Sequence, residues 1–357
     1  MPQHGQNTLQ TAERQKSPAI DGRKRTMQVF SYKDYPVKIF GLPLFEKNQK
    51  LERLPDDVIE KVPSLEFFGK RCPGGRLCFR TDSEKFTVKA KFRTLGPDAG
   101  MSVFSCQSFD VLVGDRKSPE FLGLVTPYNL QTFSFEATFT KKKVMEDVTI
   151  FLARNEIIED IQIEIEDGAD IEPPTPYRYK PVVFYGSSIT EGGCCSNVKN
   201  SYTSILSNRL DADFICLGFS GSAKGELPMA DFINTLDMSI FVFDYDHNAP
   251  DAEHLRQTHE PFFRRIREVH PYLPIVIMTM PKEVYTEEND ERASVIRQTY
   301  LNALDRGDRN VYFIDGEEFY GCEERYLCSI DGVHPNSLGF LRMANIIEPT
   351  LRKILEI

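Results

Sequence analysis

Several sequence signals are missing, and each absence removes a class of function. Neither a G-x-G-x-x-G turn after the first strand of the carboxy-terminal half nor a G-x-x-x-x-G-K-[ST] loop occurs, so no motif supports nucleotide binding. No H-E-x-x-H helix and no C-x-x-C pair occurs, and we therefore expect no metal and no cofactor. A surplus of positive charge is missing too. The net charge of −10 at pH 7 argues against a general binder of nucleic-acid phosphates.

Long apolar runs are also lacking. No stretch approaches the length that crosses a bilayer, and the amino terminus lacks the apolar centre of a secretory signal. We therefore expect no membrane partner and predict a cytoplasmic location. Eight cysteines are too few for a disulfide scaffold in a chain of 357 residues, which favours a reducing compartment. The adjacent Cys194 and Cys195 leave a redox role open, although packing is the commoner use of such a pair.

The chain is long enough for two domains, and its composition is that of a globular protein. Residues 1–26 are polar and lack periodicity, so we predict a disordered leader. Residues 27–172 consist of short β-like segments between turns, such as 85–92, in which lysine or threonine alternates with apolar residues. Many short strands without clear helices predict an all-β sandwich domain of the jelly-roll type.

A proline-rich segment, EPPTP at 172–176, marks the predicted domain boundary, because proline cannot donate to a β-ladder. Residues 173–357 then alternate strands with helices, which predicts an α/β domain with a parallel five-stranded sheet and a flavodoxin-like three-layer architecture. The predicted strands are 182–186, 214–218, 240–245, 275–280 and 311–315. The predicted helices are 202–210, 253–269, 291–305 and 337–354.

One stretch of this half ends a strand and presents a serine, Ser188. Residues 182–192 read VVFYGSSITEG, an apolar run that suits the buried centre of a parallel sheet, followed by a turn. Gly186 gives the chain room to bend where the strand ends, and active sites of open α/β sheets form at that end. Taken alone, the stretch also fits an ordinary turn with exposed hydroxyls.

Chemically useful residues follow later elements of the same domain. Gly221 follows the second predicted strand, Asn248 follows the third, and Asp331 and His334 lie in the loop before the last helix. Because the carboxyl ends of parallel strands converge on one edge of the sheet, we expect these residues to meet Ser188 there.

These residue types fit acyl transfer by a serine. A serine hydroxyl is a weak nucleophile, so it needs an imidazole to take its proton and a carboxylate to orient that imidazole, which His334 and Asp331 supply. The tetrahedral intermediate needs hydrogen-bond donors at its oxygen, for which the Ser188 N–H, the Gly221 N–H and the Asn248 amide are the candidates.

Each residue also has an ordinary structural explanation. His334 fits a surface loop, Asp331 fits a side chain that closes a turn, and Gly221 fits the entry to a helix. Their order after successive elements argues against coincidence. His247 is a further candidate for a substrate contact, with exposure or packing as the alternative.

Together these residues resemble the SGNH or GDSL hydrolase family. GSSIT at 186–190 is similar to its first block, Gly221 and Asn248 fall in its second and third, and DGVHP at 331–335 is similar to its last. The resemblance implies a nucleophile at Ser188, a general base at His334 with Asp331 as its partner, and oxyanion donors at 221 and 248.

The sequence departs from the family pattern at two places. Ser187 stands where the family has aspartate, and Ala249 follows the asparagine of the third block in place of the aspartate of Gly-x-Asn-Asp. Neither departure removes a group that transfers a proton.

The amino-terminal half resembles the β domain of a two-domain subgroup of bacterial SGNH acylhydrolases. FRTDS at 79–83 and SFDVL at 108–112 carry this resemblance, the second as a loose version of Gly-x-Asp-Leu-Tyr. The architecture is similar to carbohydrate esterases with a jelly roll beside an SGNH domain, which implies an acetylated sugar as substrate.

The leading hypothesis is therefore a serine esterase that removes small acyl groups, acetyl above all, from carbohydrates. The expected partner is a small-molecule or oligosaccharide ester. Two alternatives stay open: a lipase or thioesterase for longer acyl chains, and a glycan-binding protein whose carboxy-terminal domain is catalytically idle. The sequence does not define the oligomeric state.

Overall fold

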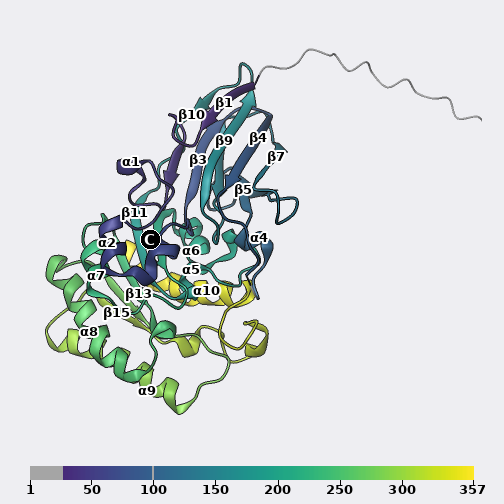
Figure 1. The fold of residues 1–357 in the computed structure, drawn as a ribbon. Helices are drawn as coiled ribbons and strands as arrows, with labels where there is room; N and C mark the ends of the chain where they lie inside the picture. Colours follow the sequence, from purple (N-terminus) through teal and green to yellow (C-terminus); the bar gives the residue numbers. More distant parts are fainter. Residues whose placement is uncertain (1–26, 99) are drawn as a thin grey trace, which may run out of the picture.

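The computed structural model describes residues 27–98 and 100–357. The predicted leader, residues 1–26, lies outside the described residues. Figure 1 shows one part built of antiparallel strands and a second part in which helices surround a parallel sheet. Within the described ranges, no helix combines the length and the apolar content needed to span a bilayer.

Two antiparallel sheets form the β domain that the sequence predicts. Their strand orders are β1-β9-β4-β7 and β10-β3-β8-β5-β6, and β2 pairs with β3. In β4, Phe86 and Val88 are buried in the core between the sheets, whereas Lys91 is exposed, as the alternation predicts. The strands are β1 (Met27–Ser31), β2 (Lys38–Phe40), β3 (Arg76–Thr81), β4 (Lys85–Phe92), β5 (Phe109–Val113), β6 (Glu120–Val125), β7 (Ser134–Thr140), β8 (Glu146–Phe151), β9 (Ile158–Glu166) and β10 (Ile171–Glu172).

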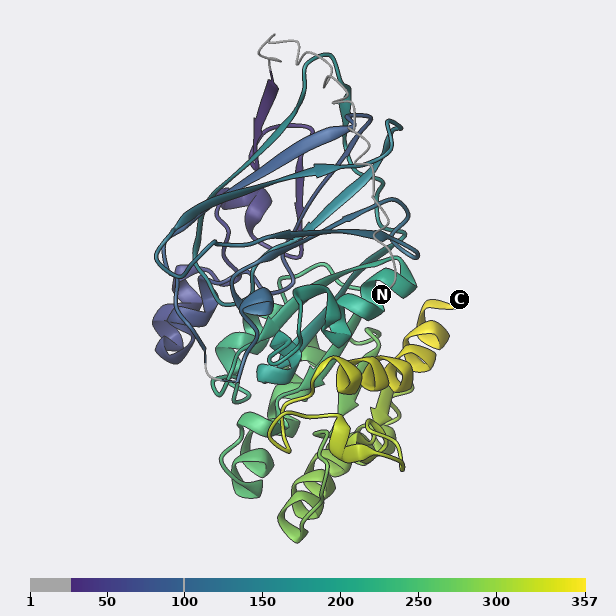
Figure 2. The ribbon, with the colours of Figure 1, turned by 90° about the vertical axis from the view of Figure 1, so that its right-hand side faces the viewer.

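The prediction that this half has no clear helices is wrong. Its helices are too short to show a 3.6-residue apolar repeat over several turns, which is the signal that sequence reading depends on. Leu54 and Val58 pack with Val183 and Leu217 of the parallel sheet. Figure 2 shows this purple-blue helical segment below the β strands, beside the α/β domain. The helices are α1 (Phe45–Asn48), α2 (Asp56–Lys61), η1 (Pro63–Leu65), α3 (Glu66–Gly69) and α4 (Val103–Cys106).

The second part is an α/β domain with a five-stranded parallel sheet, as predicted. The strand order is β12-β11-β13-β14-β15, so the first strand of the domain lies second and the chain reverses its winding between β11 and β13. This is the flavodoxin-like order, whose ligand sites form where the winding reverses, at the carboxyl ends of the strands. The strands are β11 (Tyr179–Gly186), β12 (Ala212–Gly218), β13 (Ile240–Asp244), β14 (Ile275–Met278) and β15 (Val311–Ile314).

Helices cover both faces of this sheet because alternate strand residues face opposite layers. Val183 and Tyr185 pack against α2, α7, α8 and α9, whereas Val182 and Phe184 pack against α5, α6 and α10. The structure adds α7, which the sequence did not predict. The helices are α5 (Ser188–Glu191), η2 (Val198–Asn200), α6 (Tyr202–Leu210), α7 (Leu227–Ile233), η3 (Asp246–Asn248), α8 (Ala252–Val269), α9 (Glu287–Asp305), η4 (Gly316–Glu318), η5 (Arg325–Leu327) and α10 (Ser337–Leu355).

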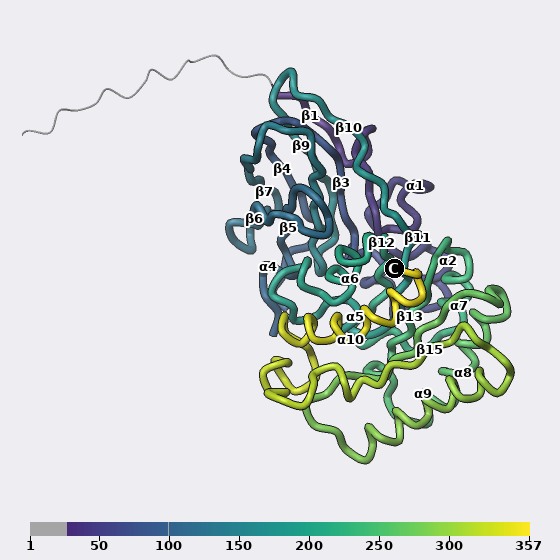
Figure 3. The backbone as a smooth tube through the Cα atoms, turned by 180° about the vertical axis from the view of Figure 1, so that it is seen from behind, coloured from purple at the N-terminus to yellow at the C-terminus, as the bar shows by residue number. Residues whose placement is uncertain are grey.

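The two parts share buried surface. Leu112 and Phe151 of the β domain belong to the same apolar cluster as Phe214 and Cys216 of β12. Arg76 of β3 forms a buried ion pair with Asp213 at the start of that strand. Seen from behind in Figure 3, β3 and β5 descend directly onto the region of β12, α5 and α6. The β domain is therefore packed onto the sheet that carries the predicted active site.

Candidate active site

Ser188 lies just beyond the carboxyl end of the interior strand β11. Ser187 caps the short helix α5, since its hydroxyl accepts a hydrogen bond from the Ile189 N–H at 3.2 Å. Ser187, at which the sequence departs from the family pattern, is therefore the cap of this helix. Gly186 is required sterically, because a Cβ there would lie 2.0 Å from the Asp244 carbonyl oxygen. These constraints fix the turn that presents Ser188.

Ser188, His334 and Asp331 form a continuous hydrogen-bonded chain. The Ser188 Oγ lies 2.9 Å from His334 Nε2, and His334 Nδ1 lies 2.7 Å from Asp331 Oδ2. A carboxylate only accepts hydrogen bonds, so Nδ1 carries the proton and Nε2 is free to accept from the serine hydroxyl. The three residues are separated by up to 146 positions in the chain, and the fold brings them together.

The Asp331 carboxyl is stabilised as an anion. Its partial burial opposes ionisation, but hydrogen bonds from the His334 backbone and ring and from the Val333 N–H outweigh this effect and lower the pKa of Asp331. The Oδ1 atom accepts the Val333 and His334 N–H groups at 3.0 and 2.7 Å, so Oδ2 is left to face the imidazole. The loop itself thus sets which oxygen meets His334.

The loop that carries His334 is tied down on both sides. The Ile330 N–H donates to the His334 carbonyl at 3.0 Å, and the Asn336 N–H donates to the Cys328 carbonyl at 2.9 Å. The Asn336 side chain caps α10 by accepting from the first-turn N–H groups of Leu338 and Gly339. A 19-residue helix therefore anchors the end of this loop.

Two predicted oxyanion donors contact each other. The Gly221 N–H donates to Asn248 Oδ1 at 3.0 Å, and Asn248 Nδ2 donates to the Phe219 carbonyl at 2.8 Å. The Gly221 N–H therefore already has a protein acceptor, which the sequence did not predict. An amide nitrogen has two hydrogens, so Asn248 keeps a second donor beyond the one that Phe219 receives. The Ser188 N–H stands in the first turn of α5, where N–H groups lack partners within the helix.

His247, the further candidate for a substrate contact, is hydrogen-bonded within the protein. Its Nε2 lies 3.1 Å from the Pro281 carbonyl, to which it is hydrogen-bonded. Burial lowers the pKa of His247 to about 3, so the ring stays neutral. This histidine packs against the loop after β14.

The two adjacent cysteines are both reduced and buried next to the serine turn. Cys195 Sγ contacts the Gly192 carbonyl at 3.0 Å and the Ser105 hydroxyl at 3.3 Å. Burial raises the pKa of Cys194 and of Cys195 to about 11, which keeps both as unreactive thiols. Among the described residues, no group of three or more His, Cys, Asp or Glu side chains is arranged to hold a metal ion.

Sequence reading missed the carboxylate of Glu191 and the guanidinium groups of Arg53 and Arg154. All three are almost wholly buried behind the turn at Ser220, although charged residues are usually exposed. The two arginines belong to the β domain and reach Glu191 across the domain contact. No local pattern marks such residues, because only the tertiary contact buries them.

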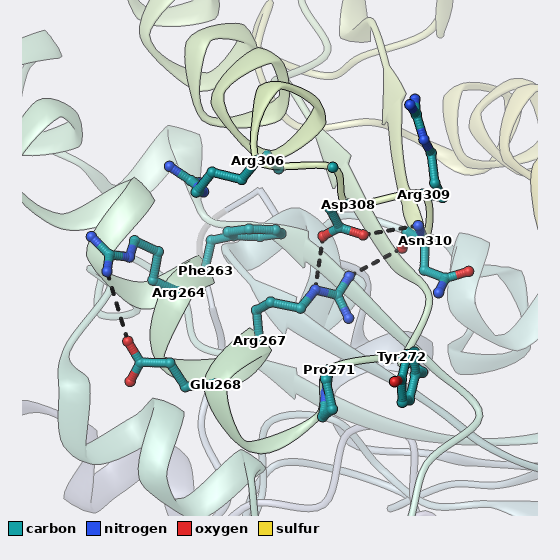
Figure 4. Close-up of a pocket in the computed structure, with 12 residues that line it drawn as sticks. Phe263, Arg264, Arg267, Glu268, Pro271, Tyr272, Arg306, Asp308, Arg309 and Asn310 are labelled. Carbon is teal, nitrogen blue, oxygen red and sulfur yellow. Dashed lines mark hydrogen bonds and ion pairs between the residues drawn. The ribbon is translucent and has the colours of Figure 1, made fainter.

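A cavity of about 490 Å³ lies at the opposite edge of the sheet. Figure 4 shows it between the ends of α8 and α9, lined by Phe263, Arg267 and Asp308. Arg267 Nε donates to Asp308 at 2.8 Å, so these two charged groups of its wall are paired with each other. Because β14 and β15 begin at this edge, the cavity is remote from Ser188.

A parallel sheet of this order, with a serine, histidine and aspartate hydrogen-bonded at its carboxyl edge, defines the class of SGNH-type α/β hydrolases. Residues 179–352 match the GDSL-like Lipase/Acylhydrolase family. The carboxy-terminal domain is therefore a GDSL-like acylhydrolase domain. The comparison with curated protein sequences finds no match.

Solved structures share the fold of both parts. A protein from Bacteroides ovatus named as a GDSL-like lipase is 22% identical, with a TM-score of 0.83, and the match covers 93% of this chain and 99% of that one. The salicylyl-acyltransferase SsfX3 of a tetracycline biosynthetic pathway is 18% identical, with a TM-score of 0.77 and coverage of 92% and 97%. A family two carbohydrate esterase from Cellvibrio japonicus is 16% identical, with a TM-score of 0.62 and coverage of 93% and 98%. At these identities the likeness concerns the fold.

Proposed function

We propose that this protein is a serine esterase that hydrolyses small acyl esters, acetyl esters above all, on carbohydrates. The observation that carries the proposal is the unbroken chain of hydrogen bonds from Asp331 through His334 to Ser188. It supplies a nucleophile, a base with a free nitrogen and an orienting carboxylate at the edge of the sheet where sites of this fold form.

The proposed reaction has two halves. Ser188 Oγ attacks the ester carbonyl while its proton passes to His334 Nε2, and the tetrahedral intermediate collapses as the protonated imidazole gives that proton to the departing alcohol. Water then gives a proton to the same nitrogen and attacks the acyl-enzyme, which releases the acid and returns the hydrogen to Ser188. Asp331 stabilises the imidazolium in both halves without taking its proton.

The negative charge of each tetrahedral intermediate needs donors that are already in place. We assign this role to the Ser188 N–H, the Gly221 N–H and the Asn248 amide, which lie on the three successive strand ends nearest the nucleophile. The Gly221 N–H donates to Asn248 Oδ1 at 3.0 Å, and this contact holds the two donors side by side.

The carbohydrate part of the proposal is supported by fold likeness to family two carbohydrate esterases. The expected partner is accordingly a small-molecule or oligosaccharide ester. The alternatives are a lipase or thioesterase for longer acyl chains and a catalytically idle glycan-binding protein. Comparing the hydrolysis of p-nitrophenyl acetate with that of the octanoate ester distinguishes an acetyl esterase from a lipase or thioesterase, because a strong preference for octanoate contradicts a deacetylase.

The test of the catalytic centre is Ser188→Ala. The variant removes only the nucleophile, so we expect kcat to fall by at least about 10³-fold, as in other enzymes of this mechanism. Circular dichroism and the melting temperature serve as controls for folding. Unchanged hydrolysis by the purified, folded variant would show that Ser188 is not the nucleophile, and absence of hydrolysis by the native chain would favour the idle binding protein.

A further inference from the structure

A buried ion cluster lies behind the turn that carries Gly221. Glu191, Arg53 and Arg154 each have 3% or less of their surface exposed. Arg53 Nη2 lies 3.7 Å and Arg154 Nη1 lies 4.0 Å from the Glu191 carboxylate. Burying charged groups costs more free energy than their attraction usually returns, so such a cluster calls for a functional explanation.

Glu191 joins the helix of the nucleophile to this turn. It lies on α5, three residues after Ser188, and its Oε2 accepts both the N–H of Ser220, at 3.0 Å, and the Ser220 hydroxyl. The next residue is Gly221, whose N–H is one of the assigned oxyanion donors. A shift of the Glu191 carboxylate would therefore move this donor relative to Ser188.

Arg53 holds the same turn from the side of the β domain. Its Nη1 donates to the carbonyls of Cys216 and Gly218 at 2.9 and 2.7 Å, and both residues lie at the carboxyl end of β12, just before the turn at Ser220. Its guanidinium also lies 4.5 Å from the centre of the Phe219 ring. Nε and Nη2 are anchored at 3.1 and 2.8 Å by two carbonyls of the amino-terminal helical segment, those of Arg71 and Phe68.

We propose that Arg53 and Glu191 are positioning residues for the oxyanion turn, so that the amino-terminal segment sets the rate of acyl transfer at Ser188. The inference rests on the proposed esterase function. A planar guanidinium with five donors in a fixed fork bonds four carbonyls at once, which an ammonium group cannot do. The arrangement therefore depends on arginine at position 53 and not on charge alone.

The test compares Arg53→Lys with Arg76→Lys. Arg76 is the matched control, because it is also fully buried, also comes from the β domain and also donates to a β12 carbonyl, that of Phe214 at 3.4 Å. Arg76 binds the start of β12, remote from the turn at Ser220, whereas Arg53 binds the end of β12, beside that turn. Steady-state kinetics with p-nitrophenyl acetate give kcat and KM for each full-length variant, and thermal unfolding gives stability.

Arg53→Lys is expected to lower kcat by roughly tenfold or more, with KM within about twofold, because losing one oxyanion donor outright costs about 10²–10³ in kcat. Arg76→Lys is expected to keep kcat within about twofold, even where its melting temperature falls. Equal kcat in the two variants would overturn the inference. If Arg53→Lys does not fold, the kcat of Ser220→Ala tests the inference instead, because this variant removes the partly exposed hydroxyl that is hydrogen-bonded to Glu191.

Ser220→Ala is expected to lower kcat by roughly threefold to tenfold at unchanged KM, as the loss of one hydrogen bond worth about 1 kcal/mol predicts. An unchanged kcat in this folded variant would overturn the inference. Failure of the proposed function looks different, since the native chain itself would then show no hydrolysis.

Discussion

Replacing Asp331 by asparagine should reverse the direction of the hydrogen bond to His334. The amide oxygen is held in place by two backbone donors, the Val333 and His334 N–H groups at 3.0 and 2.7 Å, so the new NH₂ group takes the position of Oδ2. That position lies 2.7 Å from His334 Nδ1. Because the NH₂ group can only donate, Nδ1 must give up its proton, and Nε2 then carries one toward Ser188.

An imidazole with its proton on Nε2 cannot accept the proton of the serine. We therefore expect Asp331→Asn to lower kcat by about 10³–10⁴-fold, the size of effect that a wrong tautomer has in this mechanism. The corresponding loss of transition-state stabilisation is about 4–5.5 kcal/mol. The expected loss of stability is small, because the asparagine keeps both backbone hydrogen bonds.

The assay is the steady-state hydrolysis of p-nitrophenyl acetate, with the melting temperature as the control for folding. Glu283→Gln is the matched variant, since Glu283 accepts from the Ser329 hydroxyl at 2.5 Å in the same region but does not contact His334. Its kcat should stay within about threefold of the native value. A folded Asp331→Asn protein that keeps a tenth or more of the native kcat would refute the role assigned to this carboxylate.

Two further outcomes follow from buried groups near the site. Burial and the neighbouring Asp246 raise the pKa of Asp244 well above its usual value, so above about pH 4 the folded state keeps a proton that the unfolded state has released, and the free energy of unfolding falls as pH rises. In urea unfolding, Asp244→Asn should therefore show a weaker decline of this free energy from pH 5 to pH 8 than the native chain. An identical decline would contradict the pKa direction. Gly186→Ala places a Cβ 2.0 Å from the Asp244 carbonyl oxygen and should lower the free energy of unfolding in urea by about 3 kcal/mol or more. Gly221 has φ +65° and no atom within 4 Å of the position that a Cβ would take, so Gly221→Ala should lower it by only about 1–2 kcal/mol. Equal losses at the two positions would contradict the steric argument.

The sequence allowed the α/β domain to be predicted closely because its elements are long and regular. The bounds of α6 are as predicted, and the five strands are apolar runs that need no partner to be recognised. Helix α9 begins at Glu287, before the predicted start at 291, because Thr286 and Asn289 form a reciprocal cap whose asparagine replaces the usual glutamate or glutamine.

The hydrogen-bonded residues Ser188, His334 and Asp331 could be named in advance because each lies beside an element whose end is visible in the sequence. Ser188 follows a predicted strand, and Asp331 and His334 precede the last predicted helix. The contact of Asn248 with Gly221 could not be named in advance, since it depends on how two neighbouring turns approach each other. Arg53 and Glu191 carry no local signal either, because an arginine among short segments is an ordinary surface residue until a distant strand buries it. Their pairing is a property of the tertiary fold alone.

The packing of Leu54 and Val58 against the parallel sheet also affects how the chain reaches its native state. The ribosome releases this segment before any strand of the sheet that it covers, and domains synthesised first normally fold first. Here the early segment must stay unpaired until β11 and β12 emerge more than a hundred residues later, which gives the protein contacts of high sequence separation and slow folding. We therefore expect Leu54 and Val58 to lack their native partners during synthesis until β11 and β12 have emerged.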